Sequence, residues 1–199
     1  MEQSRTYKTA DGTGATDEAL MARVKAGDDT ALAVLLRRYE GPLFHYARHM
    51  LGNAADAEDV FQETFLRVHL HRGRFWGGSA FKPWVYRIAT NLCKDRLRYR
   101  HRRPEVQPGG NEDMPDPMAN FPATATAPDE AAVARERAAR MASALAALNV
   151  KHRAVFLMAH QEGLSYAEIA RALRIPVGTV KSRMNKAVSQ LMAVLEECD

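Results

Sequence analysis

The sequence is poor in cysteine and has no long apolar run. Its two cysteines, Cys93 and Cys198, do not form a C-x-x-C pair, so the sequence indicates no disulfide framework. No stretch reaches the roughly 18 consecutive apolar residues that a membrane span requires. No apolar run at the N-terminus precedes a small-residue cleavage site. The sequence therefore predicts a reduced, cytoplasmic protein without membrane insertion.

Alternating apolar and polar residues, which are typical of strands, are also absent. Apolar residues recur instead every three or four positions, which is the spacing of amphipathic helices. The pattern predicts an all-α protein. Helices are expected over residues 17–26, 30–51 with a break around Gly41 and Pro42, 54–71, 81–103, 129–148, 151–161, 165–173 and 176–196.

Lysine and arginine are missing from one internal stretch, residues 104–130. This stretch holds six of the nine prolines and six acidic residues, which gives it a net charge of −6. It has too few large apolar residues to offset the entropy of ordering, so it is expected to be a disordered linker. The predicted organisation is a flexible tail (1–16), a helical domain (17–103), an acidic linker (104–127) and a second small helical domain (128–199).

The second domain ends in a helix–breaker–helix pattern. Ser165 and Glu168 have the spacing of a capping box that starts a helix, and Pro176 and Gly178 interrupt the pattern before a second helix. Polar and basic side chains on the first turns of that helix could donate hydrogen bonds to phosphates and base edges. From the pattern alone, a DNA-reading helix-turn-helix and a helical hairpin with a solvated basic face remain equally open. The outward set is Thr179, Lys181, Ser182, Arg183, Asn185 and Lys186.

Two stretches of the first domain also suggest a partner. Residues 56–71 begin with carboxylates, and their apolar residues cover too wide an arc for a single core stripe. That surface suits either a partner helix or complete burial in a bundle.

Residues 72–103 interleave aromatic and basic residues, which suits stacking on unpaired bases. Helical spacing places Trp84 and Ile88 in the core, and it leaves the loop 73–79 together with Asn91, Lys94, Asp95, Arg98 and Arg100 as the contact candidates. Cys93, on the same stripe, is expected to be a small buried hydrophobe.

Three segments in this order, "DAEDVFQETFLRV", "FKPWVYRIATNLCKDRLR" and "GLSYAEIARALRIPVGTVKSRMNKA", resemble the extracytoplasmic-function class of bacterial sigma factors. The resemblance spans residues 16–103 and 128–195. It implies a transcription initiation factor without an active site of its own, which binds RNA polymerase core and directs it to promoters. Residues 17–103 would then be sigma region 2 and residues 128–199 sigma region 4.

The resemblance also implies partners and site residues. The expected partners are the clamp helices of the largest polymerase subunit, the second-largest subunit, promoter DNA and an anti-sigma factor. The acidic linker would thread the RNA exit channel, because its charge suits a basic channel built for RNA. Core-polymerase binding falls on Asp59, Gln62, Glu63, Phe65 and Leu66. Recognition and melting of the minus-ten element fall on Phe75, Trp76, Gly77, Gly78, Ser79, Asn91, Lys94, Asp95 and Arg98. Recognition of the minus-thirty-five element falls on Ser165, Tyr166, Thr179, Lys181, Ser182, Arg183, Asn185 and Lys186.

Two other classes of protein are alternatives to this one. A helix-turn-helix regulator acting without polymerase would grip duplex DNA by itself, whereas a sigma factor of this class should bind promoters weakly until core enzyme joins. An enzyme is disfavoured because the sequence has no phosphate-cradling glycine loop and no nucleophile elbow. His45 and His49 are four residues apart, but no cysteine or carboxylate completes a tetrahedral set. We therefore predict neither a metal nor a cofactor.

Overall fold

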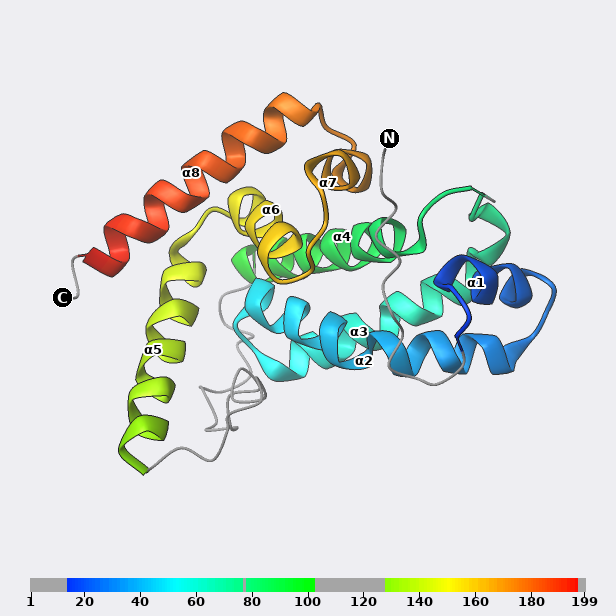
Figure 1. The fold of residues 1–199 in the computed structure, drawn as a ribbon, viewed down its shortest axis with the longest axis horizontal. Helices are drawn as coiled ribbons and strands as arrows, with labels where there is room; N and C mark the ends of the chain where they lie inside the picture. Colours follow the sequence, from blue (N-terminus) through cyan, green and yellow to red (C-terminus); the bar gives the residue numbers. More distant parts are fainter. Residues whose placement is uncertain (1–13, 77, 103–127, 197–199) are drawn as a thin grey trace.

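The computed structural model describes residues 14–76, 78–102 and 128–196, and within these residues all regular structure is helical (Figure 1). The all-α prediction is confirmed. The tail before residue 14 and the whole acidic linker (104–127) lie outside the described residues. The elements are α1 (Asp17–Lys25), α2 (Asp29–Leu51), α3 (Ala54–Leu70), the short 3-10 helix η1 (Arg72–Arg74), α4 (Phe81–Arg102), α5 (Pro128–Ala147), α6 (Val150–His160), α7 (Tyr166–Leu173) and α8 (Val177–Glu196).

Local side-chain chemistry starts most of these helices. At five N-termini a side-chain oxygen accepts a hydrogen bond from a backbone N–H of the first turn, which satisfies a donor that has no partner within the helix. Gly52 ends α2 with a left-handed φ of 69°, a conformation that favours glycine. Such short-range signals explain why the observed helices begin and end within two residues of the predicted ones. The five capping residues are Thr16, Asp28, Asn53, Asn149 and Ser165.

The break predicted at Gly41 and Pro42 was wrong, because α2 runs without interruption through both residues. A proline inside a helix has no N–H for the bond to the carbonyl four residues earlier. Burial outweighs that loss here: Tyr39, Leu43 and Tyr46 lie on one face of α2, on both sides of the proline, and are 5%, 0% and 0% exposed. Tertiary packing therefore overrides a local helix-breaking signal.

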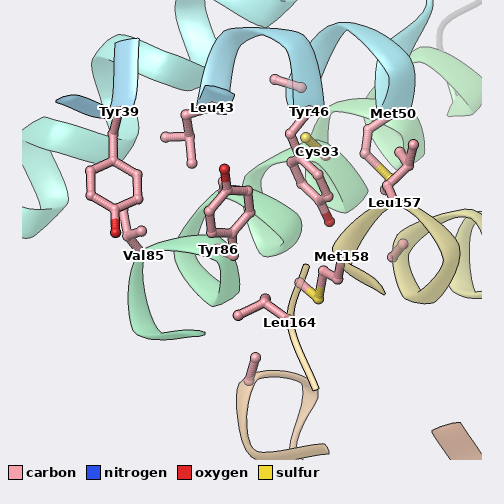
Figure 2. Packing of buried hydrophobic residues seen from close by; sticks show 14 of the residues in the cluster. Tyr39, Leu43, Tyr46, Met50, Val85, Tyr86, Cys93, Leu157, Met158 and Leu164 are labelled. Carbon is pink, nitrogen blue, oxygen red and sulfur yellow. The ribbon is translucent and has the colours of Figure 1, made fainter. Parts of the chain in front are cut away.

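Helix α2 is the centre of the N-terminal half, defined as residues 14–102, and packs against α1, α3 and α4. Its two buried tyrosines make edge-to-face contacts with Tyr86 of α4 (Figure 2). The Tyr46 hydroxyl is 2.7 Å from the Thr90 hydroxyl, so its polar end is satisfied inside the core. Cys93 is fully buried, and desolvation raises the pKa of its thiol to about 12, which confirms it as a small buried hydrophobe.

Two smaller expectations about α4 need correction. Trp84 and Ile88 were predicted to be buried, but they are only half-buried and pack at the edge of the core. Val85, Ala89 and Cys93 form the fully buried stripe of α4 instead, and Trp84 and Ile88 lie beside that stripe.

The C-terminal half, defined as residues 128–196, is built around α8, which packs against α5, α6 and α7. The two halves are in contact: α2 meets α5 and α6, and α4 meets α6 and α7 (Figure 1). Leu157, Met158 and Leu164 of the C-terminal half lie next to Met50 and Tyr86 of the N-terminal half (Figure 2). All five side chains are buried, so apolar burial holds this arrangement together. None of the helices in the described ranges combines the length and apolar character that crossing a bilayer demands.

Candidate functional site

Helices α3 and α4 border an open groove of about 690 Å³. Leu66 of α3 and Tyr99 of α4 give it apolar walls, and they are 51% and 43% exposed. Polar groups surround them: the Gln62 amide donates to Glu58 Oε1 at 2.9 Å. A groove with apolar walls and a polar rim suits a partner helix. The lining residues are Asp59, Val60, Gln62, Glu63, Leu66, Leu92, Asp95, Arg96 and Tyr99.

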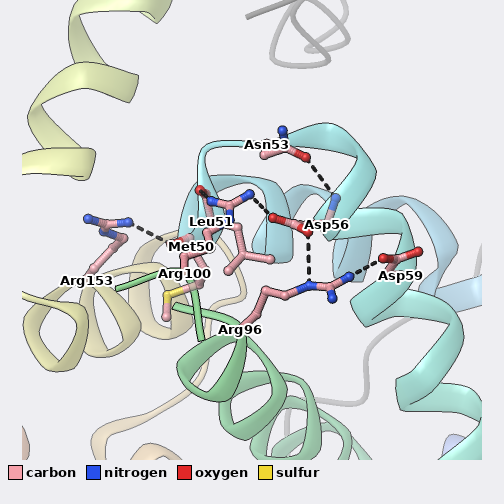
Figure 3. Close-up of polar contacts among 8 residues, drawn as sticks. All are labelled: Met50, Leu51, Asn53, Asp56, Asp59, Arg96, Arg100 and Arg153. Carbon is pink, nitrogen blue, oxygen red and sulfur yellow. Dashed lines mark hydrogen bonds and ion pairs between the residues drawn. The ribbon is translucent and has the colours of Figure 1, made fainter. Parts of the chain in front are cut away.

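An ion-pair network at one end of the groove fixes α3 on α4. The buried Asp56 carboxylate pairs with Arg100 and, at 2.9 Å, with Arg96 Nε (Figure 3). Arg96 also pairs with Asp59 at the rim of the groove. Arg100 donates to the Leu51 carbonyl at 3.0 Å. Arg100 was predicted as a nucleic-acid contact, but its guanidinium group is bound to Asp56 and to the Leu51 carbonyl within the protein.

The wide apolar arc of α3 is mostly core. Val60, Phe61, Phe65 and Val68 are all buried, and Leu66 is the member that faces solvent. Of the side chains predicted to bind core polymerase, Asp59, Gln62 and Leu66 are exposed. Glu63 is half-buried and accepts from Arg67 Nε at 2.8 Å. Phe65 is only 4% exposed. Its side chain is therefore part of the core that positions α3, and it is not available to a partner.

The loop after η1 is anchored by one aromatic residue and exposes another. Phe75 is 3% exposed and packs against the rings of Phe81 and Trp84, with centroids 6.1 and 5.2 Å away. Trp76 is 78% exposed. The predicted contact by the Phe75 side chain therefore needs correction, since that ring belongs to the core and Trp76 carries the exposed aromatic surface.

The rest of this loop makes a tight turn. Ser79 N–H donates to the Trp76 carbonyl at 3.0 Å, and Gly78 has φ of +106°, which requires glycine. Gly77 lies outside the described residues. Trp76 thus stands at the start of this turn, and its side chain is exposed.

The polar residues predicted on α4 lie mainly at the surface. Asn91, Asp95 and Arg98 are exposed, and Asp95 pairs with Arg98 at 3.2 Å. Lys94 is half-buried, and its pKa is lowered by desolvation and then by the positive charges of Arg183 on α8 and Arg98. Residues predicted to read two different DNA elements are therefore close together in this structure.

The C-terminal motif has the predicted local structure. Glu168 N–H donates to Ser165 Oγ at 3.3 Å and Ser165 N–H donates to Glu168 Oε2 at 2.8 Å, so the capping box is confirmed. Arg174 closes α7 in the left-handed conformation, and α8 begins at Val177. The α7–turn–α8 unit has the order and tight connection of a helix-turn-helix.

Helix α8 buries one face and exposes the other. Val180 and Met184 are buried, which was expected from their spacing. The opposite face offers hydrogen-bond donors: Lys181, Ser182, Asn185 and Lys186 are exposed, and Thr179 and Arg183 are half-buried. On α7, Tyr166 is 37% exposed, while the Ser165 hydroxyl is occupied by the cap.

A second cavity was not predicted. It has a volume of about 360 Å³ and lies between α3 and α4 on one side and α7 on the other. Of its lining residues only Asn91 stood among the sequence-based candidates. No local pattern could have revealed it, because its two walls come from opposite sides of the linker. Its lining residues are Arg67, His71, Arg87, Ile88, Asn91, Ala172, Leu173 and Arg174.

Comparison with known proteins identifies both halves. Residues 35–103 match the model of "Sigma-70 region 2", and residues 138–191 match that of "Sigma-70, region 4". The chain is 32% identical over 179 residues to the ECF RNA polymerase sigma factor SigW of Bacillus subtilis, covering 88% of this chain and 94% of SigW. The chain belongs to the extracytoplasmic-function class of RNA polymerase sigma factors. It is a sigma factor that directs promoter-specific transcription initiation.

Two solved structures share this fold. CnrH in complex with the cytosolic domain of CnrY superposes with a TM-score of 0.70 at 25% identity, covering 92% of this chain and 99% of CnrH. The sigma factor RpoE of Bartonella quintana, in complex with the anti-sigma factor NepR, has a TM-score of 0.59 at 19% identity, covering 89% and 92%. The second likeness supports the fold alone.

Proposed function

We propose that this sigma factor docks on the clamp helices of the largest polymerase subunit through the groove-facing surface of α3. The support is the exposure of Leu66. The other large apolar side chains of α3 between Val60 and Val68 are buried. Asp59 and Gln62 are exposed beside it, and Glu63 borders the same groove. An exposed apolar residue in a groove with a polar rim is typical of a helix-docking surface. A contact to the second-largest subunit belongs to the same proposal.

The DNA contacts are proposed for two separate surfaces. On region 2, residues 17–103, Trp76 would stack on an unpaired base of the minus-ten element, and Asn91, Lys94 and Arg98 would contact its backbone and base edges. On region 4, residues 128–199, the first turns of α8 would enter the major groove of the minus-thirty-five element. The observation that carries this assignment is the structure of α8. This helix buries Val180 and Met184, and its opposite face exposes side chains that can donate hydrogen bonds.

Run-off transcription with purified core polymerase on a promoter library tests the function. Promoter-specific transcripts are expected only when the protein is added. The proposal is wrong if no promoter opens in the presence of core polymerase and this protein, while the protein alone binds duplex DNA tightly. The chain would then be a helix-turn-helix regulator that acts without polymerase.

The docking surface is tested by Leu66→Ala, with Leu70→Ala as the matched control. Both leucines are exposed on α3, by 51% and 62%, but only Leu66 lines the groove. Truncating a central apolar contact of an interface costs about 1–2 kcal/mol, which is about a tenfold loss of affinity for core enzyme. Equal losses in the two variants would overturn the docking assignment.

The division of labour between the halves has its own test. Lys181→Ala should weaken binding that depends on the upstream element, whereas Asn91→Ala should spare the closed promoter complex and impair opening. Lys151→Ala on α6 is the control, since its side chain is exposed and lies outside both proposed surfaces. If either variant impairs the closed complex and opening equally, the assignment of separate roles is wrong.

The remaining assignments follow from the proposed partners. CnrH was solved in complex with the cytosolic domain of CnrY, and we infer that this chain likewise binds a protein partner, an anti-sigma factor, that holds it inactive. Action on polymerase core places the protein in the cytoplasm. Promoter opening itself needs no active site in this chain, because the polymerase supplies the chemistry.

A further inference from the structure

The cavity of about 360 Å³ between the two halves is lined by basic side chains from both of them. Arg67 and His71 come from α3 and its end, Arg87 from α4 and Arg174 from the turn after α7. No carboxylate is among its lining residues. Asn91 contributes a neutral amide donor. The cavity is therefore a concave site that offers donors and positive charge.

Two of the three lining arginines, Arg87 and Arg174, have no counter-charge among the described residues. Arg67 is paired with Glu63. Within the described ranges, the guanidinium groups of Arg87 and Arg174 have neither an ion pair nor a hydrogen bond. Arg174 is also the one non-glycine residue with positive φ in the part of the chain that the structure describes, at 54°, a conformation that non-glycine residues seldom adopt.

Packing of the halves brings like charges together. The pKa of Arg87 is lowered by desolvation and then by the charge of Arg174. A second pair crosses the same interface nearby, because the charge of Arg183 lowers the pKa of Lys94 after desolvation. Like charges without an intervening anion oppose the packed arrangement, whereas a bound anion would favour it.

We propose that this cavity binds a small phosphoric anhydride, such as pyrophosphate, between Arg87 and Arg174. Planar guanidinium groups hold phosphate oxygens through paired hydrogen bonds, and an anion with several charges offsets both arginines at once. The volume lies at the low end for small-molecule sites, which favours a compact ligand over a large one. Because one arginine comes from each half, the ligand stabilises the packed arrangement by mass action.

Binding of pyrophosphate to the full-length protein, measured by calorimetry at constant ionic strength, tests the proposal. Arg87→Gln and Arg174→Gln should each weaken binding about tenfold, the usual worth of a charge-assisted hydrogen bond. Arg171→Gln is the matched control, since this exposed arginine of α7 does not line the cavity. Thermal unfolding of each variant verifies that it is folded.

Further ligands distinguish the source of the phosphate groups. If a nucleoside triphosphate binds as tightly as pyrophosphate, the ligand is the phosphate chain of a nucleotide. If pyrophosphate binds more tightly, the ligand is the free inorganic anion. Absence of pyrophosphate binding, or equal loss in Arg171→Gln, overturns the proposal. Binding of a short single-stranded DNA that depends on Arg87 and Arg174, without any binding of pyrophosphate, also overturns it and assigns the surface to nucleic acid.

A second experiment measures whether pyrophosphate holds the two halves together. Spin labels at exposed positions of each half, introduced by Ala55→Cys and Ser189→Cys in a Cys198→Ser background, report the distance between the halves. Pyrophosphate should narrow the distance distribution in the otherwise unchanged protein and leave it unaltered when Arg174→Gln is added. A distribution that does not respond to saturating pyrophosphate shows that the ligand does not bridge the halves. Because none of these measurements uses polymerase, their failure is distinguishable from failure of the proposed function.

Discussion

The side chain of Glu162 lies between the two halves of the molecule and is 5% exposed. Tyr86 donates its hydroxyl to this carboxylate, and Lys82 Nζ lies 3.7 Å from it. Burial nevertheless raises the pKa of Glu162 above its ordinary value of 4.5, against the lowering effects of Tyr86 and Lys82. One buried acid thus makes the inter-half contact sensitive to pH.

The sign of that sensitivity leads to a prediction. A carboxyl group whose pKa is raised by folding binds its proton more tightly in the folded state, so its contribution to stability is greatest below pH 4.5 and is lost as the pH rises through the raised value. Glu162→Gln removes this contribution. Wild type should therefore gain thermal stability relative to Glu162→Gln as the pH falls from 7 toward 4.5. A constant difference between their unfolding midpoints over this range would contradict the prediction.

Asp56 and Asp59 form a natural pair for comparison, because both carboxylates bind Arg96. The Asp56 side chain is 11% exposed and that of Asp59 is 64% exposed. Asp56→Ala leaves Arg96 and Arg100 without a buried partner and should cost about 1–3 kcal/mol of unfolding free energy. Asp59→Ala should cost about 0–1 kcal/mol, as exposed ion pairs do. Denaturant unfolding of both variants measures the difference, and similar costs would mean that burial does not decide the strength of this network.

At the scale of the element, α2 carries a glycine and a proline in its middle and remains a single helix. Nothing lies within 4 Å of a Cβ built on Gly41, and its φ is not positive. Gly41→Ala should therefore stabilise the protein by about 0.5–1 kcal/mol, since glycine loses more backbone entropy than alanine in a helix. The unfolding midpoint in denaturant gives the value.

The cap of the same helix provides the opposite case. Gly52 has equally open surroundings but a φ of +69°, so Gly52→Ala is strained and should destabilise by about 1 kcal/mol. If both alanine substitutions shift the midpoint in the same direction, backbone conformation is not the deciding factor in α2.

At the scale of the whole molecule, the packed arrangement is at odds with contact to two promoter elements. Elements about 25 base pairs apart are separated by on the order of 85 Å of duplex, whereas Lys94 and Arg183 here lie close enough for their charges to interact. Contact of both proposed surfaces with DNA therefore requires the contact between α4 and α7 to open.

Cross-linking tests this requirement. His49 and Gln161 face each other across the halves, with Nδ1 and Oε1 3.0 Å apart. A short, cleavable thiol cross-linker joining His49→Cys to Gln161→Cys, in a Cys198→Ser background, should abolish promoter opening with core polymerase, and cleavage should restore it. His49→Cys alone, treated with the same reagent, is the control. Full activity of the cross-linked protein would show that separation is unnecessary.

The sequence by itself determined the helices, because their signals are local. Caps such as Ser165 and Asn53 act within one turn, and the apolar spacing of α8 marked Val180 and Met184 as core before any partner helix was known. The motifs on α3, α4 and α8 were sufficient to indicate the family. The break predicted at Gly41 and Pro42 was wrong, because long-range packing of the tyrosines decided the conformation there.

Tertiary structure alone decided what the side chains face. Periodicity could not separate Leu66, which is exposed, from Phe65, which is buried, nor Trp76 from Phe75, because their exposure depends on which neighbouring helix covers them. The meeting of Arg87 with Arg174 and of Tyr86 with Glu162 joins residues on opposite sides of the linker. Such contacts arise from the burial of apolar surface between the halves, a property of the assembled molecule that no local stretch of sequence encodes.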